Sequence, residues 1–183
     1  GVGEDTSFDE ALIDRVGCVV HSIDPTPKSA AWIEKRRASG EVDDRLKFYQ
    51  WALAAEDGTA EFAMPNNEDH VSGSLVNHGN VGDKTMTVTC RSVDSIAREF
   101  GHDRVDVLKL DIEGAEYDVV PSILSCGVPI GQILLEFHAR FVEDGQRRTE
   151  ELLDTMIDAG YGIFAVATGC RHYSLVHESV LKA

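Results

Sequence analysis

Apolar and polar positions alternate along the chain with two different periods, and together they predict strands separated by helices. Short apolar runs typical of buried strands lie at residues 18–23, 46–54, 105–110 and 132–137. Apolar residues recur at helical spacing between these runs, at residues 8–16, 29–39, 93–100 and 146–159. Two further strand-like runs, at residues 161–167 and 172–176, are joined by a short connection and predict a closing antiparallel hairpin.

Strands joined through helices favour a parallel sheet, so the chain is predicted to be an α/β protein with an antiparallel last strand. A length of 183 residues suits a single domain over residues 1–183. A glycine-rich loop at residues 1–7 opens the first helix, and a strand normally precedes such a loop. We therefore expect the first strand of the sheet to be missing from the sequence as it stands.

The middle of the chain interrupts the alternation of strands and helices. Residues 59–64 follow a turn at residues 55–58, which predicts a hairpin with the strand at 46–54. Residues 65–83 are polar and rich in glycine and asparagine, and we expect them to form an inserted loop. Loops of this length in compact domains tend to be functional.

Polar side chains stand at the ends of three of the predicted strands. The segment at residues 105–120, VDVLKLDIEGAEYDVV, changes from an apolar strand to a helix across Asp111 and Glu113. Asp24 ends the run at 18–23, and His138 follows the run at 132–137. The carboxyl ends of parallel strands meet at one edge of a sheet, where open α/β folds bind their ligands. The pattern predicts a polar ligand site at that edge.

These side chains also have two other interpretations, as metal ligands and as structural residues. Asp111, Glu113, Glu136 and His138 can in principle bind a hard cation such as Mg²⁺ through oxygen ligands. No HExxH motif and no repeated Asp-x-Asp accompanies them, so the sequence predicts no metal ligands. Each side chain also has a purely structural interpretation, such as a helix-starting acid at Glu113 or a satisfied core histidine at His138.

Charge, hydropathy and cysteine content restrict the kinds of partner and the cellular compartment that suit this chain. The formal net charge is −15, which argues against binding to nucleic acid or to an anionic membrane surface. No apolar run approaches the roughly 18 residues of a membrane span. The four cysteines are scattered and form no CxxC pair, which favours a reducing, cytoplasmic compartment.

The segments LKLDIEGAEYDVV and QILLEFH closely resemble the core of the FkbM family of methyltransferases. The similarity extends to GVGEDTSFD, HSIDPTP, WALAAEDGTAEF and the polar loop, and so covers most of the chain. It implies a seven-stranded Rossmann-like class I fold and transfer of a methyl group from S-adenosylmethionine to a hydroxyl of a small molecule or glycan. The glycine loop departs from the common Asp-x-Gly-Ala-Asn form of the family.

The resemblance also implies residues that bind the cofactor. Gly1 and Gly3 would let the backbone approach the methionine part, and Asp24 would bind the ribose hydroxyls. An acid about 20 residues after a glycine loop is typical of that role. Trp51 and Ala52 would lie near the adenine.

The remaining residues that the resemblance singles out surround the reaction. Asp111 would face the amino-acid end of the cofactor or the reacting centre, while Glu113 and His138 would line the acceptor side. His138 is the first candidate for the base that takes the hydroxyl proton, since its ordinary pKa lies near 6.5. Glu113 or Asp111 is the second candidate.

Two other functions remain open at this point. A glycine loop followed by a strand-ending acid also fits an NAD(P)-dependent oxidoreductase, although Thr6 stands where that fingerprint has its third glycine. A non-catalytic module that keeps the methyltransferase fold is the second alternative, and the intact carboxylates at Asp111 and Glu113 count against it.

Overall fold

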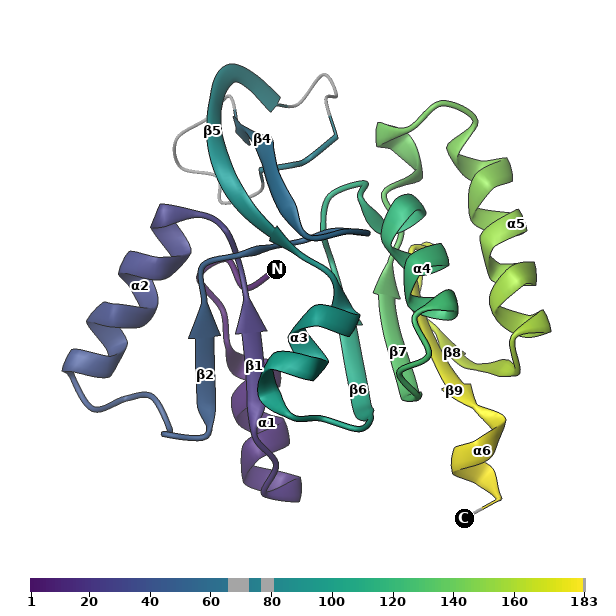
Figure 1. The fold of residues 1–183 in the computed structure, drawn as a ribbon, viewed down its shortest axis with the longest axis horizontal. Coiled ribbons are helices and arrows are strands. Elements are labelled where there is room, and N and C mark those ends of the chain that lie inside the picture. The colour runs from purple at the N-terminus through teal and green to yellow at the C-terminus, as the bar shows by residue number, and fades with distance from the viewer. Residues whose placement is uncertain (66–72, 77–80, 183) are drawn as a thin grey trace.

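The computed structural model describes residues 1–65, 73–76 and 81–182. The chain is a mixed α/β protein whose described strands form three sheets (Figure 1). The strands are β1 Val20–Ile23, β2 Leu46–Tyr49, β3 Ala52–Leu53, β4 Gly58–Pro65, β5 Val81–Arg91, β6 Val105–Leu110, β7 Ile130–Glu136, β8 Tyr161–Val166 and β9 His172–His177. The helices are α1 Ser7–Val16, α2 Pro27–Ala38, α3 Val93–Phe100, α4 Glu116–Ser125, η1 Ala139–Phe141, α5 Gly145–Asp158 and α6 Glu178–Leu181.

The largest sheet contains four strands in the order β6-β7-β9-β8. β6 and β7 are parallel, whereas β9 is antiparallel to both β7 and β8. The antiparallel last strand and the closing hairpin are therefore confirmed. The main core lies against this sheet, where Ile133 and Leu175 from the strands and Val120 and Met156 from α4 and α5 are fully buried.

A second sheet consists of β1 and β2, which are parallel. Its core is formed by Ile13, Ile33 and Leu46, from α1, α2 and β2. Among the described strands, β1 pairs only with β2 and β6 only with β7, so each has one open edge. Both strands line the same cavity, and the N-terminus lies between them (Figure 1). The single continuous sheet that the sequence predicts is thus divided between β1 and β6, because no described strand bridges them.

The third sheet, β3-β5-β4, corrects the predicted central hairpin. The run at residues 46–54 breaks after Tyr49, and its second part, β3, pairs in parallel with β5. β4 pairs antiparallel with the same β5, so β3 and β4 are not hydrogen-bonded to each other. The hairpin prediction is wrong because β5 lies between the two strands, and its Cys90 pairs with Ala52 of β3 on one edge and with Gly58 of β4 on the other.

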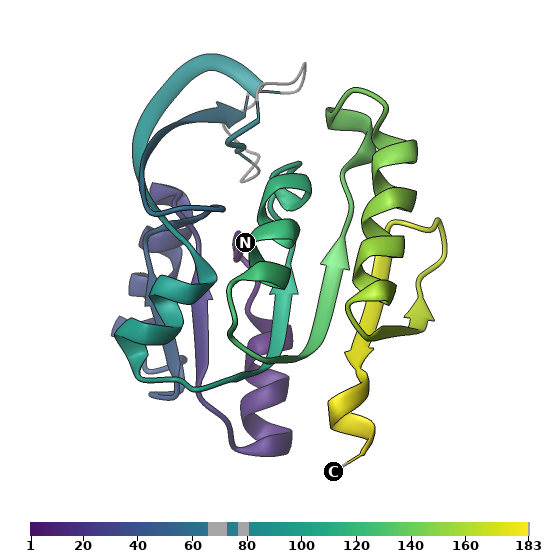
Figure 2. The ribbon, with the colours of Figure 1, turned by 45° about the vertical axis from the view of Figure 1, so that its right-hand side comes forward.

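The predicted loop at residues 65–83 is shorter than expected at both ends. Pro65 belongs to β4 and Val81 begins β5. Residues 66–72 and 77–80 lie outside the described part of the chain. Between them, residues 73–76 run back beside β4 through a bridge from Ser74 to Ala63. The β3-β5-β4 sheet stands above the ends of β1 and β6, as the two views agree (Figures 1 and 2).

Two further expectations concern membrane-spanning helices and the cysteines. No helix in the described residues is long and apolar enough to cross a membrane. Cys18, Cys90, Cys126 and Cys170 are all free thiols.

Candidate active site

The turn after β6 carries the two carboxylates that the sequence singled out. Glu113 has a φ of 53° and Gly114 a φ of 102°, so two consecutive residues have left-handed backbone. This conformation suits glycine, but costs a residue with a Cβ on the order of 1 kcal/mol. Contacts with other segments hold the turn, because Ser74 Oγ donates a hydrogen bond of 2.6 Å to the carbonyl of Glu113.

The buried carboxylate of Glu116 lies under this turn. It is 0 % exposed and stands at the first residue of α4, where the helix dipole favours a negative charge. Its oxygens accept hydrogen bonds from Ile112 N at 3.0 Å and from Gly114 N at 2.9 Å. His138 Nδ1 lies 2.9 Å from Oε1 and completes the set. Glu116 therefore joins the turn to the end of the neighbouring strand.

Glu116 is a site residue that the sequence does not predict. The available signal was a third acid at the start of a helix whose next positions, Tyr117, Val119 and Val120, are apolar and buried. A carboxylate on a buried face needs hydrogen-bond partners. The sequence does not say that one of these partners is a histidine 22 positions away.

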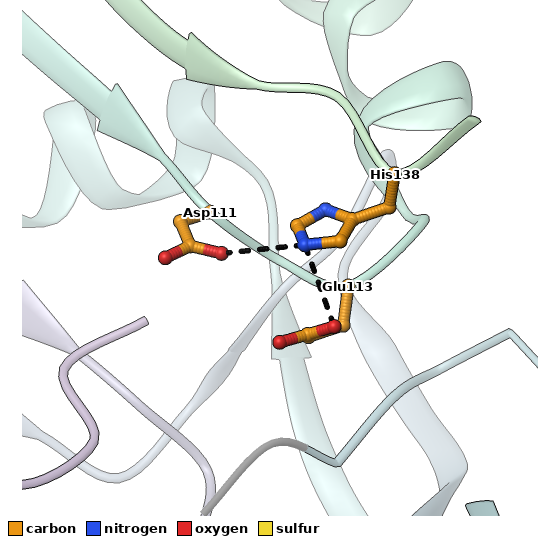
Figure 3. Close-up of side chains that lie close together, drawn as sticks. All are labelled: Asp111, Glu113 and His138. Carbon is orange, nitrogen blue, oxygen red and sulfur yellow. Dashed lines mark ion pairs between the residues drawn. The ribbon is translucent and has the colours of Figure 1, made fainter. Parts of the chain in front are cut away.

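His138 follows β7 and is 2 % exposed, with its ring stacked on Phe141 at 5.4 Å between centroids. Since Nδ1 faces Glu116, Nε2 points the other way, toward the turn. Nε2 lies 3.4 Å from Glu113 Oε2 and 3.8 Å from Asp111 Oδ1 (Figure 3). The structure thus brings together the three residues that the sequence placed around the reaction.

The surroundings of His138 change its acidity. Burial of the ring on its own lowers the pKa of His138. The hydrogen bond to Glu116, and then the charges of Glu116, Glu113 and Asp111, act in the opposite direction and outweigh burial. The pKa of His138 is therefore raised above its ordinary value of 6.5.

Asp24 ties down the glycine loop. It is 5 % exposed, and its Oδ2 accepts hydrogen bonds from Val2 N at 2.8 Å and Gly3 N at 3.0 Å. Its Oδ1 accepts from Thr26 N at 2.9 Å and Thr26 Oγ1 at 2.6 Å. Protein donors occupy both oxygens, so a ribose would have to replace some of them. The ribose role of Asp24 stays a prediction.

The glycine loop also touches the acidic turn. A Cβ on Gly1 would lie 2.6 Å from the carbonyl oxygen of Asp111, closer than real Cβ atoms approach backbone. Gly3 has a φ of 60°, which also favours glycine. Both glycines are therefore required by the backbone, and Gly1 brings the loop against the end of β6.

The predicted adenine side lies on the opposite wall. Trp51 follows β2, stacks on Tyr49 at 4.8 Å between centroids and has the Arg91 guanidinium 5.3 Å from its ring. Ala52 begins β3 and is buried. An aromatic ring beside a small buried residue is compatible with a flat ligand. The adenine role of Trp51 and Ala52 stays a prediction.

One cavity of about 1770 Å³ joins these walls. Seven of the eight predicted site residues line it: Gly1, Gly3, Asp24, Trp51, Ala52, Asp111 and Glu113. His138 is not among the lining residues and reaches the cavity through Asp111 and Glu113. Ligand pockets usually occupy about 300–1,000 Å³. The larger volume here arises because the cavity continues down the gap between β1 and β6.

Comparison with known proteins identifies the class. Residues 3–163 match the family model described as the methyltransferase FkbM domain. The chain belongs to the FkbM family of methyltransferases, as the DIEGAE segment indicated. Membership implies S-adenosylmethionine as the methyl donor.

Two curated relatives carry the description "probable methyltransferase-like protein 24". The one from Homo sapiens is 29 % identical over 140 residues, covering 75 % of this chain and 31 % of that protein. The one from Rattus norvegicus is 28 % identical over 140 residues with the same coverage. The chain thus spans about a third of the length of these relatives. No solved structure matches the chain.

Replacing Glu116 with Gln tests its role in the site. The change keeps the size of the side chain but removes the charge and turns an amide group toward backbone donors. We expect a loss of about 2–4 kcal/mol in the free energy of unfolding. The pKa of His138 should fall, because burial remains while its nearest anion is gone. Urea denaturation and NMR titration of the imidazole in metal-free buffer measure the two effects.

The control is Glu61→Gln, which removes the same charge from an exposed position on β4. It should leave the pKa of His138 unchanged and cost less stability than Glu116→Gln, because the hydrogen bond that Glu61 accepts from Thr87 is exposed. The stability that protonated His138 adds is present below its ordinary pKa of 6.5 and is lost as the pH rises through its raised value. The advantage of wild type over Glu116→Gln should shrink over that range. An unchanged pKa of His138 in the variant would contradict the assigned contact.

Proposed function

We propose that this protein transfers the methyl group of S-adenosylmethionine to a hydroxyl oxygen of a small molecule or glycan. One observation carries the proposal: the glycine loop and the acidic turn meet at one end of a single cavity. The glycine loop supplies backbone that can approach a cofactor. The acidic turn supplies carboxylates that can accept the proton of the acceptor hydroxyl. Membership of the methyltransferase family supports methyl transfer as the reaction.

We also propose that the β1-β2 and β6-β7-β9-β8 sheets are two parts of a Rossmann-like class I methyltransferase sheet. The parallel pairing within each part supports this assignment, as does the antiparallel β9 beyond β7. Apart from Gly1 and Gly3, the site residues follow the carboxyl ends of β1, β2, β6 and β7, where open α/β sheets bind ligands.

Within this proposal the cofactor lies along the upper part of the cavity. Gly1 and Gly3 approach its methionine part, Asp24 its ribose, and Trp51 and Ala52 its adenine. Asp111 lies on the cofactor side, where its carboxylate attracts the positively charged sulfonium. The tight contact between Gly1 and the end of β6 supports this arrangement, because it keeps Asp111 beside the loop.

The reaction is a displacement at the methyl carbon. The acceptor oxygen forms a bond to that carbon while the carbon–sulfur bond breaks, and its electrons stay on sulfur as S-adenosylhomocysteine leaves. The main task of the protein is to align the oxygen with the methyl group. The hydroxyl proton passes to Glu113, which lines the cavity, or through it to His138, whose Nε2 lies 3.4 Å from Glu113 Oε2.

The test of this function begins with cofactor choice. At 100 times its dissociation constant, S-adenosylhomocysteine should stabilise the protein by about 2.7 kcal/mol, whereas NAD at the same concentration should have no effect. Thermal unfolding with each ligand measures this difference. Stabilisation by NAD alone would favour the oxidoreductase and overturn the proposal. A protein that binds S-adenosylhomocysteine but methylates no member of a panel of hydroxylated acceptors would instead fit the non-catalytic module.

The role of Asp24 can be separated from its structural contacts. We expect wild type to bind S-adenosylhomocysteine more tightly than its 2′,3′-dideoxy analogue, because the analogue cannot donate to the carboxylate. In Asp24→Ala both ligands should bind weakly and with equal affinity. Isothermal titration calorimetry supplies the four dissociation constants. If the analogue is weaker by the same factor in both proteins, Asp24 only holds the glycine loop.

His138→Ala should separate binding from transfer. We expect S-adenosylhomocysteine to bind as in wild type, because His138 does not line the cavity. Transfer of labelled methyl groups to hydroxylated acceptors should slow by at least about 100-fold, the usual contribution of a group that handles the proton. The control is His177→Ala, which should retain transfer, because His177 lines the cavity beside the start of β7, at the opposite end of that strand from His138. Equal rates for wild type and His138→Ala would remove His138 from the acceptor side.

A further inference from the structure

The cluster around His138 holds more negative charge than the protein neutralises. Four carboxylates, from Asp111, Glu113, Glu116 and Glu136, lie within ion-pair distance of this one imidazole. Among the residues that the structure describes, no lysine or arginine forms an ion pair with Asp111, Glu113 or Glu116. Carboxylates that share a site repel one another unless a cation lies between them. Glu136 is also paired with His172, at 2.9 Å. Among the described residues, Glu113 and Glu116 have only the His138 imidazole as an ion-pair partner.

The buried ring of His138 is oriented toward the acidic turn. The side chain is buried, and its Nδ1 is held by Glu116 at 2.9 Å. Its Nε2 is aimed at the turn and makes no hydrogen bond with any described residue. Of the three carboxylates around Nε2, Glu113 is the nearest, with Oε2 at 3.4 Å. A histidine that ligates a metal usually donates its other ring N–H to a carboxylate in this way, which fixes the tautomer and the direction of the free nitrogen.

The distances suit a shared cation. The ligand atoms of Asp111, Glu113 and His138 all lie within 4.8 Å of one another, with Nε2 at 3.4 Å and 3.8 Å from the two carboxylates (Figure 3). Two atoms that each lie about 2.1 Å from one cation are roughly 3.0 Å apart at a right angle and roughly 3.4 Å apart at the tetrahedral angle. Small rotations of the two partly exposed carboxylates would close the remaining difference.

We propose that Asp111, Glu113 and His138 form a binding site for one divalent cation, with Oδ1, Oε2 and Nε2 as its ligands. A mixed set of imidazole and carboxylate suits an ion such as Mn²⁺, because it accepts both nitrogen and hard oxygen ligands. Asp111 and Glu113 line the cavity, so the cation would keep open positions toward it. Glu116 acts as a positioning residue, since it holds both the imidazole and the turn that carries the carboxylates.

The role of this cation rests on the proposed methyl transfer. A divalent ion that binds the acceptor oxygen lowers the pKa of the hydroxyl and fixes the direction of its attack. The hydroxyl can then lose its proton to solvent before the carbon–oxygen bond forms. A nitrogen that ligates the cation cannot accept that proton, so His138 would act as a ligand in place of a base.

The site is tested by binding Mn²⁺ to protein freed of metal with EDTA and dialysed. Electron paramagnetic resonance follows the free ion, and nitrogen coupling to bound Mn²⁺ reports the imidazole. We expect one Mn²⁺ per chain with nitrogen coupling. Affinity should fall at least tenfold in Glu113→Gln and His138→Ala, and by about 10–100-fold in Glu116→Gln. Glu61→Gln, with the same loss of charge at an exposed position on β4, should bind like wild type.

Some outcomes would overturn the site. These are the absence of stoichiometric Mn²⁺ binding, or equal binding by wild type, Glu113→Gln and Asp111→Asn. Asp111→Asn keeps the shape of a partly exposed side chain, and so tests the site even if His138→Ala fails to fold by circular dichroism. S-adenosylhomocysteine binding is measured on the same metal-free samples. Cofactor binding without Mn²⁺ binding defeats the metal site alone, whereas Mn²⁺ binding without cofactor binding defeats the methyltransferase proposal alone.

Discussion

The carboxylate of Glu116 is the interaction on which the geometry of the site depends. Burying an ionised carboxylate costs several kcal/mol unless it is fully hydrogen-bonded. Here two backbone amides of the acidic turn and one imidazole nitrogen supply those bonds, and the start of α4 adds its dipole. The same three bonds impose the left-handed turn at Glu113 and the direction of the His138 ring. The Glu116 carboxylate therefore holds the turn that follows β6 and the imidazole that follows β7 in one fixed arrangement.

A second buried carboxylate organises the opposite side of the cavity. Asp24 binds the amides of Val2 and Gly3 much as Glu116 binds those of the acidic turn. The two loops then meet where Gly1 contacts the carbonyl of Asp111. The site is held by bonds between loops, so it does not require that β1 and β6 belong to one sheet. Ser74 adds a third connection, from the segment between β4 and β5.

Local signals made parts of this structure predictable. Ser92 and Gly101 define both ends of α3, because a hydroxyl cap and a left-handed glycine act within one turn of helix. The closing hairpin is similarly local. The failed hairpin at residues 46–64 depended on which strand β3 and β4 choose, and that partner, β5, lies far along the chain. Asp24, Asp111 and His138 converge because each follows the end of a strand. The role of Glu116 could not be predicted, because it depends on a histidine that follows a different strand. The candidate cation ligands also come from two strands, which no short sequence motif records.

The gap between β1 and β6 has a consequence for the behaviour of the protein in solution. Each strand presents amides and carbonyls along one edge, and both edges open into the same cavity. Open strand edges are templates on which other chains add. A segment of extended polypeptide from a neighbouring molecule would find hydrogen-bond partners on both sides at once. The outer edge of β8 offers hydrogen-bond partners on one side only, so the gap is the stronger acceptor of an added strand.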